Sequence, residues 1–193
     1  MKTKFTIALF LFIATSSIKA QTDPILDAFT KSHYFEKFVN YTSAIDALKP
    51  VYSADSYEIN LRMGWLHYKV GLAKESMDYY AIASKLLPNS LEARIGYVYA
   101  ALSIKETELV LAQYLKILEI APLSSSINYH IGNVYYAKKD YVKADAHFKT
   151  VVDLYPFDYD GLLMYAWTSY RLERISQAKV LFNHIGPQWK GSF

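Results

Sequence analysis

The chain has 193 residues, of which 21 are Lys or Arg and 18 are Asp or Glu, so its formal net charge is +3. This length predicts one domain or two, and a hydrophobic content of 52% excludes a wholly disordered chain. Cysteine is absent, which excludes disulfides, a thiolate nucleophile and cysteine-ligated zinc.

Residues 1–20 have the pattern of a secretory signal peptide. Lys2 and Lys4 precede an apolar stretch at residues 5–14, and Ala20 ends a plausible cleavage site. The apolar stretch is shorter than the roughly 20 residues of a membrane-spanning helix, which makes an uncleaved anchor the alternative rather than the first choice. We therefore expect an exported protein, periplasmic or else secreted, with no stable membrane span after cleavage.

The signal-peptide pattern also accounts for the basic net charge. Residues 1–20 hold three lysines and no acid, which leaves 18 basic and 18 acidic residues in the rest of the chain. A neutral body gives no general electrostatic reason to bind nucleic acid. We expect no nucleic-acid partner.

Hydrophobic periodicity and helix-breaking residues predict ten helices joined by short loops. The expected ranges are 25–39, 42–52, 57–69, 73–87, 91–104, 107–120, 125–138, 141–154, 159–172 and 175–186. Pro88, Pro122 and Pro156 each follow an apolar helical run and are spaced by 34 residues. A proline there ends a helix, because it lacks an N–H and clashes with the preceding turn. A fixed spacing of this length predicts an array of repeated units.

One unit shows the repeat pattern in full: Asn128-x2-Ile131-Gly132-x2-Tyr135, then Ala144-x3-Phe148, then Pro156. This pattern resembles the tetratricopeptide repeat. The units would cover residues 57–90, 91–124, 125–158 and 159–193, after a degenerate helix pair at 21–56 displaced by about two residues. The resemblance implies an all-α fold, a right-handed superhelix of stacked antiparallel helix pairs.

Large side chains at one repeat position are expected to fill the core between successive helix pairs. These are Tyr80, Tyr114, Phe148 and Phe182. In the unit from residue 91, Gly96 comes two places early and Val98 replaces a small residue, which predicts looser or shifted packing there.

The resemblance implies a concave groove lined by the first helix of each pair. Carried over position by position, the predicted partner-binding residues are Arg62, Trp65, Tyr68, Lys69, Tyr99, Tyr129, His130, Asn133, Tyr136, Met164, Trp167, Tyr170 and Arg171. The same positions also hold Glu58, Leu61, Glu92 and Ile95. Aromatic residues and arginine dominate binding energy at interfaces, so this face predicts a groove for a partner peptide or helix. The alternative is that these rings pack on one another.

We therefore expect a non-catalytic protein-interaction scaffold with no cofactor and no metal. A self-associating protein joined through the end faces of the array is the alternative. A hydrolase using His130 or Ser176 is the weakest interpretation, because no acid, base and nucleophile cluster in the sequence. His67, at a core position, is expected to be packed rather than reactive. Asp158 and Asp160 fit a helix N-terminus better than a calcium loop.

The last helix of an array needs a polar cap or a cover. Here its apolar residues are followed only by a short tail, so we expect Trp189 and Phe193 to fold back over it, or a partner to cover it.

Overall fold

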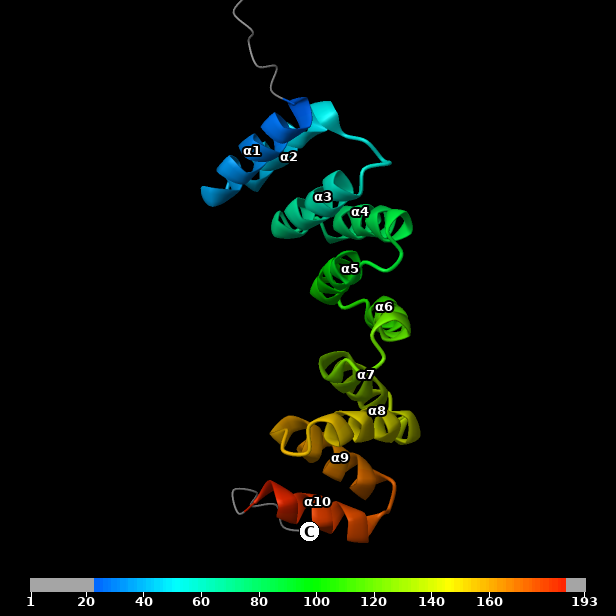
Figure 1. Ribbon diagram of the computed structural model, residues 1–193. Coiled ribbons are helices and arrows are strands. Elements are labelled where there is room, and N and C mark those ends of the chain that lie inside the picture. Colours follow the sequence, from blue (N-terminus) through cyan, green and yellow to red (C-terminus); the bar gives the residue numbers. More distant parts are fainter. Residues whose placement is uncertain (1–22, 187–193) are drawn as a thin grey trace, which may run out of the picture.

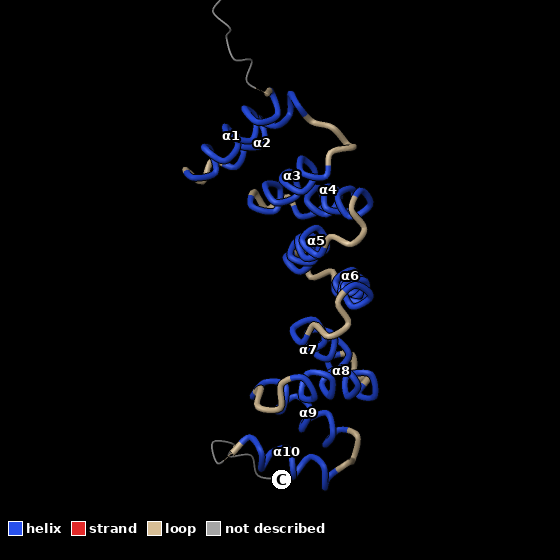
Figure 2. Tube along the Cα trace, viewed as in Figure 1, coloured by secondary structure: helices blue, strands red, loops and turns tan. Residues whose placement is uncertain are grey.

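The computed structural model describes residues 23–186, and within them every regular element is helical (Figures 1 and 2). Ten α-helices and one 3-10 helix, η1, follow one another in these residues: α1 (Pro24–Lys37), α2 (Tyr41–Leu48), η1 (Lys49–Val51), α3 (Tyr57–Lys69), α4 (Ala73–Leu86), α5 (Leu91–Ser103), α6 (Thr107–Ile120), α7 (Ser125–Ala137), α8 (Tyr141–Leu154), α9 (Tyr159–Arg171) and α10 (Ile175–Ile185). The predicted signal peptide and the predicted fold-back of Trp189 and Phe193 lie outside the described residues.

Side-chain caps set the start of several helices. Ser56 accepts a hydrogen bond from the backbone N–H of Ile59 at 3.3 Å, and Asp158 accepts one from Gly161 at 2.7 Å. Asp23, Asn40, Ser90 and Asp140 cap their helices in the same way. Such caps satisfy N–H groups that have no partner within the helix. The N-cap predicted around Asp158 is confirmed.

In each later pair, a residue with positive φ lies two positions after the end of the first helix. These residues are Gly71, Lys105, Lys139 and Glu173, with φ between 60° and 83°, and they are spaced by 34 residues. In the first pair the equivalent residue is Val39, at φ 59°. Val39 breaks the spacing by two residues, so the displacement predicted for the degenerate pair is visible in the backbone.

The second helix is shorter than the sequence predicts. A helix was expected over residues 42–52, but α2 ends at Leu48 and the chain continues as η1. Pro50 lies inside η1 and restricts the conformation of the residue before it, which disfavours a continued α-helix.

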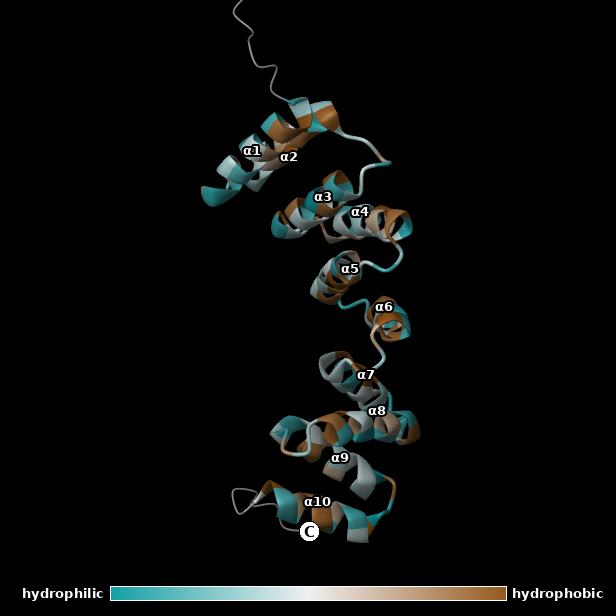
Figure 3. Cartoon of the chain, in the orientation of Figure 1, coloured by the Kyte–Doolittle hydropathy of each residue, from teal (hydrophilic) through white to brown (hydrophobic). Residues whose placement is uncertain are grey.

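Consecutive helices pack pairwise, and the pairs follow one another along the long axis of an elongated molecule (Figure 1). The second helix of each pair also contacts the first helix of the next. The four predicted core residues are buried at the junctions: Tyr80, Tyr114, Phe148 and Phe182 are each at most 6% exposed. Hydrophobic and hydrophilic stretches alternate along the helices (Figure 3), as expected when each helix buries one face.

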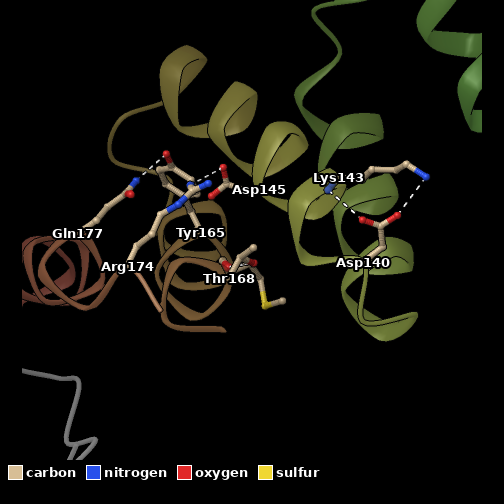
Figure 4. Close-up of polar contacts among 8 residues, drawn as sticks. Asp140, Lys143, Asp145, Tyr165, Thr168, Arg174 and Gln177 are labelled. Atoms are coloured by element: carbon tan, nitrogen blue, oxygen red, sulfur yellow. Dashed lines mark hydrogen bonds and ion pairs between the residues drawn. The ribbon is translucent and has the colours of Figure 1, made fainter. Parts of the chain in front are cut away.

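Polar contacts join the helices of the C-terminal half (Figure 4). Arg174, the residue before α10, forms an ion pair with Asp145 of α8 at 2.9 Å. Gln177 of α10 donates a hydrogen bond to the Tyr165 hydroxyl of α9 at 2.8 Å. These contacts join the N-terminal end of α10 to both α8 and α9. No helix among residues 23–186 is long and apolar enough to cross a membrane.

Candidate functional site

A hollow of about 770 Å³ lies where α1, α3 and α5 face one another. We call it the N-terminal hollow. It is lined by Phe29, His33, Glu58, Leu61, Arg62, Trp65, Tyr80, Glu92, Ile95, Gly96 and Tyr99. Most of these side chains are aromatic or aliphatic, and only four carry an ionisable acid or base other than tyrosine. The site is therefore an apolar hollow with a few charged groups at defined places.

Neighbouring repeats supply equivalent residues to this hollow. Glu58 and Glu92 are 34 residues apart, and each lies in the first turn of its helix. The same spacing relates Leu61 to Ile95. It also relates Trp65 to Tyr99, which is 52% exposed. The hollow thus presents two successive copies of one pattern, an acid, an aliphatic side chain and an aromatic ring.

An ion pair joins α1 to α3 at one wall. The Nη1 atom of Arg62 lies 2.6 Å from Oε2 of Glu36, and the indole N–H of Trp65 donates to Oε1 of Glu36 at 2.6 Å. Arg62 Nε also donates to Ser32 at 3.2 Å. Partial burial acts to raise the pKa of Glu36, but these hydrogen bonds and the charge of Arg62 outweigh it, so the pKa is lowered. Glu36 is therefore ionised and neutralises Arg62.

Tyr80 of α4 forms the base of the hollow. Its ring occupies the space above Gly64 and Gly96, where a Cβ atom would lie 2.9 Å and 2.3 Å from ring carbons. Burial, together with the negative charge of Glu92, raises the pKa of Tyr80 above its usual value. The sequence predicted looser or shifted packing around Gly96. The packing there is tight, because the missing side chain makes room for Tyr80 of the preceding unit.

Aromatic rings continue the wall beyond the hollow. Trp65 and Tyr68 have ring centroids 6.0 Å apart, and Tyr68 and Tyr99 are 6.4 Å apart. The ammonium group of Lys69 lies 5.1 Å from the centre of the Trp65 ring and 5.4 Å from that of Tyr41. The structure thus brings all five predicted site residues of α3 and α5 into or beside the N-terminal hollow.

The predicted site residues of α7 and α9 lie in a different environment. His130 stacks on Tyr114 with centroids 5.5 Å apart, and Trp167 packs on Phe182 at 5.2 Å. Tyr129 lines a second hollow of about 600 Å³ near the loop ends of α7 and α9. Of the other predicted residues, three are half-buried and two are exposed: Asn133, Tyr136, Met164, Tyr170 and Arg171. In this half His130, Tyr129 and Trp167 each contact a buried ring of a neighbouring helix: Tyr114, Phe148 and Phe182.

The residues considered for chemistry are separated or occupied. His67 is buried, and its Nδ1 lies 2.7 Å from the carbonyl oxygen of Met63, so the prediction of a packed histidine is confirmed. His130 of α7 and Ser176 of α10 belong to different helix pairs. Within residues 23–186, no three His, Asp or Glu side chains gather as a metal ion would require.

Part of the hollow was not predicted from the sequence. Phe29, Ser32, His33 and Glu36 share one face of α1 and form a wall of the hollow or hold it in place. The degenerate first pair has no repeat register, so the positions of the family pattern could not be carried over to it. The spacing of these residues by three and four is the signal that could have identified a common face.

Comparisons with known proteins agree with this architecture. Residues 128–158 match the family model of the tetratricopeptide repeat. No curated protein matches the sequence. The solved structure of MamA AMB-1 superposes with a TM-score of 0.70 at 17% identity, covering 87% of this chain and 93% of that one.

Two further structures have the same arrangement of helices. MamA from Desulfovibrio magneticus RS-1 has a TM-score of 0.67 at 20% identity, covering 86% of this chain and 95% of that one. A tetratricopeptide repeat protein from Parabacteroides merdae ATCC 43184 has a TM-score of 0.70 at 18% identity, covering 84% and 65%. At these identities the likeness concerns the fold. The predicted fold is therefore confirmed: the described residues form an all-α, right-handed superhelix of stacked antiparallel helix pairs, the arrangement of the solved structures that the chain matches.

Proposed function

We propose that this protein is an exported, non-catalytic scaffold that binds a peptide or helix of a partner protein on the face formed by α3, α5, α7 and α9. The observation that carries the proposal is the N-terminal hollow. Its walls contain Trp65 and Tyr99, and Tyr99 is 52% exposed. Partly exposed aromatic rings in a concave site are the groups that bury most area on binding.

Export is the second part of the proposal. It is supported by the sequence of residues 1–20, with two early lysines, a short apolar stretch and Ala20 at the end. The proposal places the protein in a periplasm or, failing that, outside the cell.

The test is capture of a partner by the tagged protein in the organism that produces it. A photo-crosslinking residue replaces Tyr99, and the trapped partner is identified by mass. In a second strain, the protein also carries Trp65→Ala. We expect crosslinking at position 99 to be lost in that strain, because a ring that the partner would bury is gone.

The matched control removes two exposed side chains in loops between pairs, Leu123→Ala and Phe157→Ala, which are 69% and 86% exposed. It should capture the partner normally. Because Trp65 holds Glu36, a gentler variant, Leu61→Ala, tests the same surface without that contact. Undiminished capture by Leu61→Ala and by a folded Trp65→Ala variant would contradict the proposal.

Self-association through an end face is a second candidate, and one observation favours it. The outer side of α1 exposes Leu26, Tyr34 and Phe38, which are 65%, 59% and 68% exposed. An end helix without a neighbour leaves such a face open to a second copy. Light scattering over a wide concentration range tests this: a monomer at every concentration eliminates it, and Tyr34→Glu with Phe38→Glu should dissolve any oligomer.

A further inference from the structure

The N-terminal hollow contains more negative than positive charge. Its one guanidinium, Arg62, is neutralised by Glu36 at 2.6 Å. Glu58 and Glu92 also line the hollow, and neither forms an ion pair with any described residue. Glu58 accepts a hydrogen bond from Ser56 at 3.2 Å, which leaves its charge uncompensated. With His33 neutral or protonated, the hollow keeps a net negative charge.

The two carboxylates accompany apolar surface of a particular shape. Each lies at the same repeat position, next to an aliphatic side chain and an aromatic ring on the same helix face. Lysine and arginine side chains have a long apolar stem and a charged head. The stem can cover Trp65 or Tyr99, whose faces attract a cation, while the head meets a carboxylate.

We propose that the N-terminal hollow selects a basic side chain, lysine or arginine, in an extended segment of the partner protein. This inference rests on the proposed function and adds the chemistry of the bound residue. The segment would place its basic residue between Glu58 and Glu92, with the stem against the rings of Trp65 and Tyr99. An acidic or uncharged residue at that place would leave both carboxylates without a counter-charge beneath the bound segment.

The first-turn position of Glu58 and Glu92 also has an explanation that involves no ligand, and the experiment below distinguishes it from ligand selection. A carboxylate at a helix N-terminus interacts favourably with the helix dipole without any ligand. If that were their whole role, replacing them would change stability and leave ligand preference unaltered.

The probes are blocked nine-residue peptides that differ only at their central residue: arginine, lysine, citrulline or glutamate. Citrulline keeps the length and planar head of arginine but carries no charge. Binding is measured by calorimetry and by the NMR resonance of the Trp65 indole N–H. That resonance is assigned as the one missing from the spectrum of Trp65→Phe. We expect the arginine and lysine peptides to bind about tenfold more tightly than the citrulline peptide, and the preference to weaken with salt.

The decisive variant is Glu58→Gln with Glu92→Gln. It should bind arginine and citrulline peptides equally, because the charges that discriminate are removed. Its matched control is Glu75→Gln with Glu119→Gln, which makes the same change in net charge at exposed sites on α4 and α6 and also removes one first-turn acid. The control should keep the preference for arginine.

Equal binding of the arginine and citrulline peptides by the natural protein would overturn the inference, and so would a preference that survives in Glu58→Gln with Glu92→Gln. If no peptide moves the Trp65 resonance, the inference also fails. In each case the crosslinking experiment at Tyr99 judges the proposed function separately, since a trapped partner would uphold the groove without its charge preference.

Discussion

Asn60 and Asn128 occupy the same place in two units that are two repeat lengths apart, and they brace the chain in the same way. The side-chain amide of Asn60 donates to the carbonyl oxygens of Ser53, Ala54 and Ser56. The amide of Asn128 donates to the carbonyl oxygens of Pro122 and Ser124. Both are nearly fully buried. Each amide thereby satisfies carbonyls of the loop that leads into its own helix.

Replacing either amide should therefore destabilise the fold. Asn60→Ala or Asn128→Ala removes these hydrogen bonds and empties a nearly fully buried position, and we expect a loss of about 1–3 kcal/mol in the free energy of unfolding. Urea unfolding followed by circular dichroism measures it. Asn183→Ala, at an exposed position on α10, is the control and should change stability by less than about 0.5 kcal/mol. Equal stability of all three variants would refute the bracing role.

The contact between Gly96 and Tyr80 gives a second prediction. In Gly96→Ala the new methyl group would meet the Tyr80 ring at 2.3 Å, so overpacking should cost about 1–3 kcal/mol. Tyr80→Leu replaces the ring by a smaller aliphatic side chain and so removes the obstacle. The double variant should therefore be more stable than the sum of the two single effects predicts. A thermodynamic cycle with strictly additive terms would show that the close approach does not matter.

Val39 should be replaceable with a gain in stability. It is 68% exposed and has a φ of 59°, a conformation that is costly for a residue with a branched β-carbon. We expect Val39→Gly to raise the melting temperature by about 1–3 °C, since strain is relieved and little buried surface is lost. The control is Val142→Gly, a 67% exposed valine inside α8, where glycine should lower stability. A lower melting temperature for Val39→Gly would contradict the assignment of strain.

His147 makes stability depend on pH. Its Nδ1 lies 2.9 Å from Oδ1 of Asn128, and its ring stacks on Tyr135. Because Asn128 Oδ1 can only accept, Nδ1 carries the proton of the neutral ring. Burial lowers the pKa of His147 below that of a free histidine side chain. The unfolded chain therefore takes up a proton more readily than the folded one as the pH falls.

The low pKa of His147 should make the protein less stable at acidic pH. Its contribution to the free energy of unfolding is fully present above about pH 6.5 and is lost as the pH falls through the lowered pKa of the folded state. Urea unfolding at pH 7.5 and pH 5 should show a smaller loss of stability for His147→Gln than for the natural protein. His184→Gln, at an exposed position, should keep the full loss. Burial also lowers the pKa of His130, so this residue should contribute to the loss that remains.

Local sequence signals were sufficient for the helices and their order. Proline spacing and apolar periodicity predicted ten helices, and α3, α6 and α8 have the predicted bounds. The large residues at the repeat's core position, such as Phe148, are buried where the pattern places them. These features depend on interactions within one helix or between neighbouring pairs, which a 34-residue period records directly.

The sequence could not predict contacts between units that do not share the repeat register. Glu36 was not a candidate, because the first pair is displaced by two residues from the repeat. The structure nevertheless places it 2.6 Å from Arg62 and within hydrogen-bonding distance of Trp65. Gly96 was interpreted as a sign of looser or shifted packing, although its role is to receive a ring from the preceding unit. Both features depend on how close two residues on different helices come, which the sequence pattern does not record.

The sequence by itself determined the helical repeat, the neutral charge of the chain after residue 20 and the aromatic character of the first helices. Only the tertiary structure decided which of those aromatic residues remain available. Trp65 and Tyr99 line an open hollow, whereas Trp167 packs on the Phe182 ring. The physical reason is that periodicity specifies which side of a helix a residue lies on, while its exposure depends on how α1, α3 and α5 diverge and on what packs against α9.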